Sequence, residues 1–591
     1  MSAHTPPSQD IRHTAMLAHW GQFLVHDIVL SRETETNCSS THAEESDDVC
    51  FNFAIPRDDP DLGHINSIFP FKRTVSCSQN GFRQQVNQLT SFIDASTVYG
   101  SQTLETLRIR ERTPKDTGKL RTNNHYFSSA GKGYLPFDTS GDMQCFRNRS
   151  KEDGMNCFLA GDVRANEQVM LTALHTVFLR EHNRIATQLK AVNPEWNGET
   201  IFYEARKIVG AIVQQITYRE WLPKILGSVG MEMMGRYKGY DPQANPGIAN
   251  SVTAAAFRFG HALMVPRLQR MTQGFKNDQF KESLQLRDAF FAPERLVHDG
   301  GIDPLIRGSV GAPVKDIRSE SLVNKELTNH LFPSAHDFPL DLAALNIQRG
   351  RDHALPPYNQ YRILCGLPKI TSWEQFKFEA RDARHVDQLI DLYRDPEKLD
   401  LWVGGLMERP IRGGKVGRTF SCLLADQFKR LRSGDRLWFE NPGVFGLDQL
   451  QTIREYTLSK VLCNNMDDPM WIPEDAFVYY PRTIRQFIRC DTLPDINLSL
   501  WRIENNGFAG AIECTSPDCT CRYQIGRWTE CSESRKRTRT DFLISGPFPP
   551  CTPERKLESI CSTPERQKVL GFHHGRGPLF NRRNRILLRS K

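Results

Sequence analysis

The sequence of 591 residues predicts a mainly α-helical protein with a small cysteine-rich extension at its C-terminal end. Apolar residues recur at helical spacing over several long segments, whereas strand patterns are few and short. After about residue 502 the helical periodicity disappears, and cysteine, proline and basic residues become frequent. We therefore expect a frayed start at residues 1–10, one large domain at 11–502 and a separate extension at 503–591.

The first expected helix covers residues 11–30, where Trp20, Phe23 and Leu24 form an apolar side. Residues 31–90 are rich in proline, aspartate and serine, which favours loops. Six further helices are expected at 167–192, 199–226 (opened by Asn197), 252–264, 373–394, 420–432 and 447–459.

Composition argues against several classes of protein. The net charge of +7 is small for this length, and no stretch interleaves basic and aromatic residues, so nucleic acid is not an expected partner. No apolar run approaches the roughly 20 residues of a membrane span, so we expect no transmembrane segment. The sequence Gly413-Gly414-Lys415 lacks the leading glycine of a phosphate-binding loop, because Arg409 stands there.

The cysteine content points to an oxidising compartment. Fifteen cysteines, none in a C-x-x-C pair, and sequons at Asn37, Asn148 and Asn497 fit a secreted, disulfide-bonded glycoprotein better than a zinc protein. The polar start lacks the apolar region of a signal peptide, so we expect the natural start to lie further upstream. An odd cysteine count leaves at least one thiol free or paired with another chain.

Four segments place polar side chains where chemistry can use them. They are Trp20–Asp27 with Gln22 and His26, Gly161–Met170 with Arg164 and Glu167, Phe257–Met264 with Arg258 and His261, and Leu89–Ser96 with Thr90, Phe92, Asp94 and Ser96. Singly, each has an ordinary interpretation as a core histidine, a surface arginine or a polar loop. The alternating residues of the last segment can turn their oxygens to one side, as a hard cation such as calcium requires.

Together these segments supply what peroxide chemistry at a haem iron needs. One histidine must hold the iron, and a second, neutral histidine must move a proton between the two peroxide oxygens. An arginine must stabilise the charge that develops on the departing oxygen.

The segments WGQFLVHD, LTSFIDASTVYGS, FLAGDVRANEQ, FRFGHAL and LNIQRGRDHALPPYN resemble those of the animal haem peroxidase family, in the same order, from about residue 11 to 502. The resemblance implies a helical fold with haem b buried between central helices. It also implies reduction of hydrogen peroxide through a ferryl intermediate, followed by oxidation of a halide, thiocyanate or a phenolic or tyrosyl donor.

The resemblance also assigns roles. On the distal side of the haem, His26 corresponds to the catalytic histidine, Arg164 to the arginine and Gln22 to the glutamine. On the proximal side, His261 corresponds to the iron ligand and Asn346 to the asparagine that hydrogen-bonds its far nitrogen. Arg258 corresponds to the arginine near a haem propionate. The calcium ligands of the family correspond to Asp27, Thr90, Phe92 (through its carbonyl), Asp94 and Ser96. Its disulfides correspond to Cys145–Cys157, Cys365–Cys422, Cys463–Cys490 and Cys38–Cys50.

The chain departs from the family pattern beside the distal histidine. The family usually has an aspartate there that forms an ester with a haem methyl, but this chain has Val25. Glu167 corresponds to the second ester-forming residue, and Gln168 stands where a sulfonium link would need methionine. We therefore expect at most one covalent bond to haem and a weaker oxidant, which favours iodide, thiocyanate, phenols or tyrosine over chloride. Cys77 has no clear partner in the family pattern and is the expected odd thiol.

The alternative is a catalytically weak extracellular matrix or adhesion protein that keeps the peroxidase fold. Val25 favours this alternative, whereas the retained polar residues oppose it. A cyclooxygenase-like activity is disfavoured because Ala254–Phe257, ahead of His261, contains no tyrosine. The extracellular matrix is a candidate partner in either case. In the extension, Arg527–Thr540 is similar to part of a thrombospondin type 1 repeat but lacks an expected cysteine, and a different disulfide-bonded extension is the alternative.

Overall fold

The computed structural model describes most of the chain from residue 8 to 503, and the backbone of three strands beyond it. The residues outside this description are 1–7, 37, 39–47, 65–67, 80–81, 112–116, 146–154, 278–282, 337, 482–485, 504–511, 514–518, 525–526 and 534–591. The sequon residues Asn37 and Asn148, and every side chain after Ile503, therefore lie outside the described residues.

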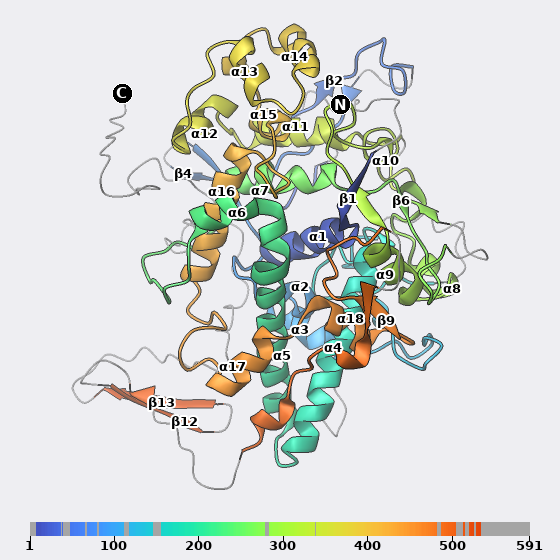
Figure 1. Ribbon diagram of the computed structural model, residues 1–591, viewed down its shortest axis with the longest axis vertical. Coiled ribbons are helices and arrows are strands. Elements are labelled where there is room, and N and C mark those ends of the chain that lie inside the picture. The colour runs from blue at the N-terminus through green and yellow to red at the C-terminus, as the bar shows by residue number, and fades with distance from the viewer. Residues whose placement is uncertain are drawn as a thin grey trace.

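The N-terminal segment begins with a strand rather than a helix. Strand β1 (Gln9–Thr14) pairs antiparallel with β8 (Pro313–Lys315), and helix α1 (Met16–Ile28) follows. The helix expected over 11–30 is therefore shorter than predicted, because segments distant in sequence take the backbone hydrogen bonds of its first residues. The Thr14 N–H donates to the Phe477 carbonyl, and the Arg12 carbonyl accepts from the Tyr479 N–H. Helix α1 lies near the middle of the molecule, where it packs against several other helices (Figure 1).

The first residues that the structure describes are not frayed. Gln9 and Asp10, expected in the frayed start, both belong to the strand. The Asp10 carboxylate is buried and forms an ion pair with the Lys415 ammonium group. A buried charge persists only when it is paired, so this contact holds the start of the chain against the body of the protein.

Two long helices run through the molecule. Helix α4 (Val169–Val192) packs against α5 (Gly198–Gln215), and the two stand together in the lower half of Figure 1. A π-helical turn, η3 (Ile216–Trp221), then leads into α6 (Leu222–Met234). The helix expected over 199–226 is thus correct in place but continues further and contains a wider turn.

Side-chain caps begin both long helices. The Gln168 side-chain oxygen accepts a hydrogen bond from the Met170 N–H at 2.7 Å. Asn197 caps the second helix in the same way, accepting from the Thr200 N–H at 2.8 Å. Each cap satisfies a backbone donor that has no partner within the helix.

The helix expected over 252–264 is broken into two short pieces. A helical turn, α7 (Asn250–Ala254), is followed by a 3-10 segment, η4 (Ala256–Ala262), and Ala255 between them leaves helical geometry at φ −138° and ψ −67°. Apolar periodicity alone does not distinguish a continuous helix from two short ones, because both bury the same side chains.

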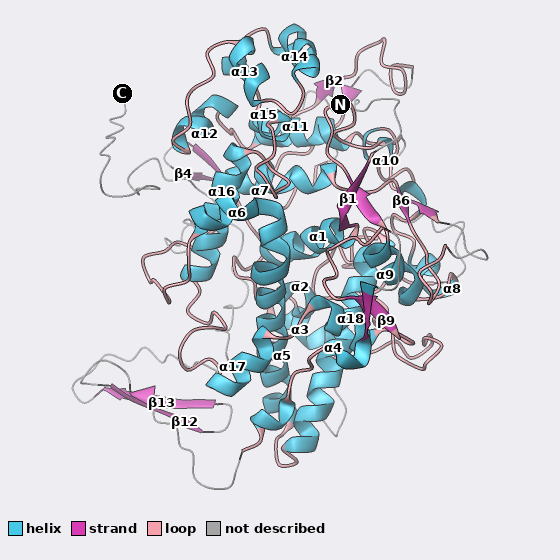
Figure 2. Cartoon of the chain, viewed as in Figure 1, coloured by secondary structure: helices cyan, strands magenta, loops and turns pink. Residues whose placement is uncertain are grey.

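The remaining elements are short helices and small antiparallel sheets (Figure 2). The helix expected over 373–394 is interrupted by a 3-10 turn, and that over 447–459 divides in two. The bounds are β2 Phe53–Ala54, β3 Ile68–Phe69, β4 Ser76–Gln79, β5 Phe82–Gln85, α2 Ser96–Tyr99, α3 Thr103–Ile109, β6 Arg267–Leu268, β7 Leu284–Gln285, η5 Leu286–Asp288, α8 Pro293–His298, α9 Ile302–Gly311, α10 Lys325–Thr328, α11 Leu342–Asp352, α12 Tyr358–Leu364, α13 Trp373–Glu379, η6 Ala383–His385, α14 Val386–Tyr393, η7 Pro396–Lys398, α15 Leu401–Met407, α16 Arg418–Ser433, α17 Leu447–Arg454, α18 Leu458–Asn465, β9 Trp471–Pro473, β10 Phe487–Arg489, η9 Cys490–Thr492, η10 Leu498–Trp501, β11 Ile512–Glu513, β12 Cys519–Gln524 and β13 Arg527–Glu533.

Disulfides join several of these elements. The structure contains Cys38–Cys50, Cys145–Cys157, Cys365–Cys422 and Cys463–Cys490. Cys77 is also disulfide-bonded, so the expectation of a free thiol at this position is wrong. Among the helices that the structure describes, none has both the length and the hydropathy needed to cross a membrane.

Candidate active site

His26 lies near the end of α1 and is buried. Burial, reinforced by the nearby Arg164 guanidinium, lowers the pKa of this imidazole well below its usual value, so the ring is neutral at physiological pH. Its Nε2 atom lies 3.7 Å from a carboxylate oxygen of Glu167. Its Nδ1 atom is buried without a hydrogen-bond partner among the described residues.

The Arg164 guanidinium is held by a neighbouring carboxylate. Its Nε and Nη2 atoms donate to the two oxygens of Asp162 at 2.9 and 2.8 Å, and Nη2 also donates to the Val29 carbonyl at 3.0 Å. Asp162 lies 3.8 Å from Nδ1 of His26. The carboxylate therefore contacts both distal residues and fixes where the guanidinium lies.

Asp162 is a site residue that the sequence analysis missed. Burial alone would raise the pKa of this carboxyl, but the Arg164 charge, with His26 and hydrogen bonds adding to it, brings the pKa down to about 2. The available signal was its position two residues before the arginine in the segment GDVR. Nothing local in that segment indicates that the acid turns toward the distal histidine.

Glu167 joins the distal helix to the start of α4. Gln22 on α1 donates from Nε2 to Glu167 Oε1 at 3.2 Å, and Gln168 donates from Nε2 to Gln22 Oε1 at 2.9 Å. Burial raises the pKa of Glu167 to about 7, against the opposing effect of the Arg164 charge. The carboxyl is therefore near the midpoint of its titration at neutral pH.

The second histidine lies on the 3-10 segment η4. His261 Nδ1 is 2.9 Å from Asn346 Nδ2, and Arg258 donates from Nη1 to Asn346 Oδ1 at 2.7 Å. Because arginine only donates hydrogen bonds, the amide oxygen faces Arg258 and the amide NH2 faces the imidazole. Burial lowers the pKa of His261 to about 3, so this ring is also neutral.

The two histidine segments adjoin, because η4 packs against α1. A Cβ atom built on Gly260 meets nothing within 4 Å, so there is open space beside the proximal histidine. An imidazole whose far nitrogen is already bonded suits an axial iron ligand, and open space beside it suits a flat macrocycle. The residues present therefore fit a haem.

The loop Leu89–Ser96, which the sequence predicts to bind calcium, adjoins two buried carboxylates. Asp27 accepts hydrogen bonds from the backbone N–H groups of Asp94, Ala95 and Thr97 at 3.1, 3.2 and 2.9 Å. The Ser96 hydroxyl donates to the Asp27 carbonyl at 2.9 Å. Thr90 donates to Asp94 at 3.2 Å.

Burial, followed by the charge of Asp94, raises the pKa of Asp27 well above its usual value, and burial likewise raises the pKa of Asp94. The Arg206 guanidinium opposes this rise for Asp94, and a further cation beside the two carboxylates would favour their ionised forms. The structure thus brings together Asp27, Thr90, Asp94 and Ser96, with Phe92 in the same loop between them.

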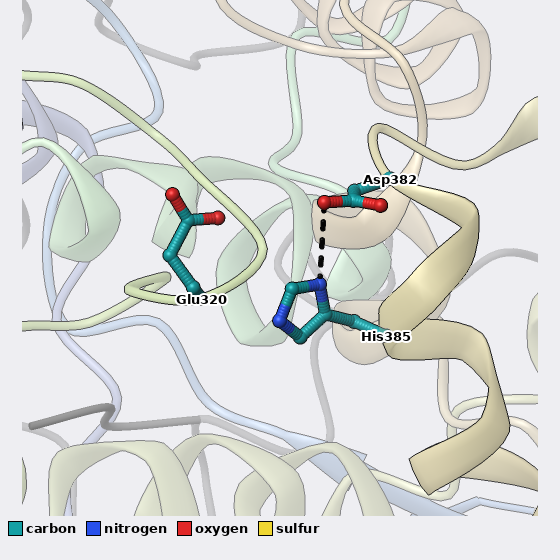
Figure 3. Close-up of side chains that lie close together, drawn as sticks. All are labelled: Glu320, Asp382 and His385. Atoms are coloured by element: carbon teal, nitrogen blue, oxygen red, sulfur yellow. Dashed lines mark ion pairs between the residues drawn. The ribbon is translucent and has the colours of Figure 1, made fainter. Parts of the chain in front are cut away.

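A further cluster lies outside the site that the sequence predicted. Glu320, Asp382 and His385 approach one another, and the His385 Nδ1 atom is 3.4 Å from Asp382 (Figure 3). Arg384, however, donates from Nε to Asp382 Oδ1 at 3.0 Å and from Nη2 to Oδ2 at 2.6 Å. The cluster is therefore an ion-pair group at the start of α14.

The helical framework and the adjoining histidine segments define a haem peroxidase type of protein. The family model for animal haem peroxidases matches residues 1–477. This chain belongs to the animal haem peroxidase family.

Relatives in the family include peroxidasins and a myeloperoxidase. The chain is 45% identical over 509 residues to the peroxidasin homolog pxn-2 of Caenorhabditis elegans, with 83% of this chain and 38% of that protein covered. It is 41% identical over 571 residues to the human peroxidasin homolog, with 93% and 37% covered. It is 40% identical over 510 residues to mouse myeloperoxidase, with 84% and 70% covered. The chain thus spans less than half of the peroxidasin relatives it matches.

Solved structures share the fold. Peroxidase A from Dictyostelium discoideum aligns with a TM-score of 0.68 at 27% identity, covering 81% of this chain and 89% of that chain. The fatty acid alpha-dioxygenase of Arabidopsis thaliana aligns with a TM-score of 0.64 at 21% identity, covering 85% and 78%. The second likeness concerns the fold alone.

Proposed function

We propose that this chain is a haem-dependent peroxidase that reduces hydrogen peroxide and oxidises a small anionic or phenolic donor. The observation that carries the proposal is the neutral, buried His26 beside an Arg164 guanidinium held in place by Asp162. A neutral imidazole accepts a proton, and a fixed guanidinium stabilises negative charge without changing its own protonation.

In this proposal His261 would hold the haem b iron through Nε2, and Arg258 would pair with a haem propionate. The bound haem supplies the redox chemistry. His26 accepts a proton at Nε2 from one peroxide oxygen and then donates it to the other peroxide oxygen, while Arg164 stabilises the charge on the leaving oxygen. Gln22 lines the same side.

The hydrogen bond between His261 and Asn346 must reverse its direction for His261 to bind iron. A ligating Nε2 carries no proton, so Nδ1 must donate, and Asn346 must then present its amide oxygen to His261. In the structure that oxygen faces Arg258. Pairing of Arg258 with a propionate carboxylate would release the amide to turn.

Val25 allows at most one ester link to haem, through Glu167, and a calcium ion held by the Asp27 loop braces the distal helix. With one link we expect iodide, thiocyanate, a phenol or tyrosine as the donor rather than chloride. The likeness to peroxidasins and to a myeloperoxidase, together with the disulfides, supports an extracellular location and makes matrix a candidate partner. A catalytically weak matrix protein is the second candidate, favoured by Val25.

The test uses purified protein reconstituted with haemin. We expect a Soret band, and consumption of peroxide with iodide or guaiacol, in the wild type. His26→Leu should bind haem but lose about 10²-fold or more in its rate of reaction with peroxide. His19→Gln is the matched control, because His19 is a second buried histidine on the same helix.

If His26→Leu keeps the wild-type rate, or if the wild type binds haem without consuming peroxide, the proposal is wrong. The latter result would favour the matrix protein.

A further inference from the structure

The hydrogen bonds around Gln168 leave no freedom in the direction of two side-chain amides. Gln168 Oε1 accepts from the Met170 N–H at 2.7 Å, and a backbone N–H only donates. The other end of this amide is therefore its NH2 group, which donates to Gln22 Oε1 at 2.9 Å. The NH2 group of Gln22 must then face Glu167 Oε1, at 3.2 Å.

We propose that Gln168 is a positioning residue for covalent haem attachment: it fixes the amide of Gln22, which in turn holds the carboxyl of Glu167 for ester formation. This inference rests on the proposed function and deepens it. A helix cap thereby determines where a reactive carboxyl lies, through two hydrogen bonds.

The reaction that this arrangement serves is balanced with peroxide as the oxidant. The carboxyl of Glu167 loses its hydrogen, a haem methyl group loses one C–H hydrogen, and a carbon–oxygen bond forms between them. Hydrogen peroxide accepts these two hydrogens, with their two electrons, as its O–O bond breaks, giving two molecules of water. Peroxide is already the substrate of the proposed function.

Burial makes the amide relay effective. The Gln168 side chain is buried and Gln22 is half-buried, so water competes little for their hydrogen bonds. The Glu167 side chain is 25% exposed, and its other oxygen lies 3.7 Å from Nε2 of His26. In the described part of the chain, Gln22 supplies the hydrogen bond that fixes Oε1.

Loss of the relay has a specific consequence. If Gln168 no longer donates, the Gln22 amide can turn, and its oxygen then faces the oxygen of Glu167. In its ionised form the Glu167 carboxylate is an acceptor like the amide oxygen, so the two groups repel each other and the carboxylate moves away from its position. The expected result is slower attachment of haem, with haem binding itself retained.

Two substitutions separate this role from the role of Gln168 as a helix cap. Gln168→Ser keeps an oxygen that caps α4 but is too short to reach Gln22. Gln168→Glu also keeps a capping oxygen, and at a pH high enough to ionise it, its carboxylate accepts from Gln22 instead of donating. Asn197→Ser, which changes the cap of α5 away from the site, is the matched control.

The experiment measures attachment rather than turnover. Each protein is reconstituted with haemin, treated with one equivalent of hydrogen peroxide, denatured at intervals and chromatographed in an acidic organic solvent. Intact mass then gives the fraction of chain that carries haem. The Soret absorbance before peroxide shows that each variant has bound haem.

We expect the wild type and Asn197→Ser to attach haem at the same rate, and both Gln168 variants to attach it about tenfold or more slowly. Attachment at the wild-type rate in both Gln168 variants would overturn the inference. A wild type that consumes peroxide but attaches no haem would overturn the inference and leave the peroxidase function standing. A wild type that binds haem without consuming peroxide would overturn the proposed function itself.

Discussion

Replacing Asp162 with asparagine tests whether this buried carboxylate holds the distal arginine. Its side chain is 1% exposed and accepts the hydrogen bonds that Nε and Nη2 of Arg164 donate. The folded protein lowers the pKa of Asp162 from 3.8 to about 2. A shift of this size corresponds to about 2 kcal/mol of stability at neutral pH.

The sign of the pH dependence follows from the direction of this shift. Because the pKa is depressed in the folded state, the contribution is complete above about pH 4 and is lost as the pH falls through 2. We expect Asp162→Asn to lower the free energy of unfolding by about 2 kcal/mol at pH 7, and by about half of that at pH 3. Released from its partner, Arg164 should also stabilise the leaving oxygen poorly, with a loss of about 10²-fold in the peroxide reaction.

The measurement is urea unfolding with the disulfides intact, followed by tryptophan fluorescence at both pH values. Asp391→Asn, an exposed carboxylate on α14, is the control for removing a negative charge. A deficit in Asp162→Asn that is equally large at pH 3 and pH 7, or no deficit at all, would refute the reasoning.

Three further predictions concern the same region. Val25→Asp should add a second haem attachment after peroxide treatment, seen as a second haem-bearing peptide by mass spectrometry, and an unchanged peptide pattern would contradict the role given to this position. Chelation of calcium should lower the melting temperature more at pH 7 than at pH 5. Burial raises the pKa values of Asp27 and Asp94, so their ionisation without a cation destabilises the fold as the pH rises. Equal shifts of the melting temperature at both pH values would count against the calcium site. Once Glu167 is esterified to haem and no longer titrates, His26 is kept neutral by burial. The rate of reaction with peroxide should then change by less than about twofold between pH 5 and 8 in stopped-flow measurements, and a steep fall toward pH 5 would contradict this assignment.

The helical class and most helix positions were predictable from sequence because amphipathic periodicity is a local property. The α4 and α5 helices follow that pattern, and a polar residue, Gln168 or Asn197, caps the start of each. The break at Ala255 was not predictable, because one helix and two short ones bury the same side chains. Just after the break, the Arg258 carbonyl accepts a hydrogen bond from the indole of the distant Trp402 at 3.4 Å. Such a contact leaves no local signal.

The candidate site divides in the same way. The segments around His26, Arg164 and His261 could be recognised because each is a distinctive run of residues. Asp162 and the direction of the Asn346 amide were not foreseen, since both depend on which side chains meet in the folded protein. Residue type indicates the chemistry available, whereas hydrogen-bond direction requires coordinates.

The pairing of β1 with β8 has a mechanical consequence for the distal histidine. Helix α1 follows that strand almost directly, and near its other end Asp27 accepts hydrogen bonds from the backbone N–H groups of Asp94, Ala95 and Thr97. The helix is thus held at both ends by contacts with distant segments, and His26 lies next to one of these contacts. A tag fused ahead of residue 8 leaves both contacts in place. A proteolytic cut within Gln9–Thr14 removes the pairing with β8 and lets the His26 imidazole move from its position.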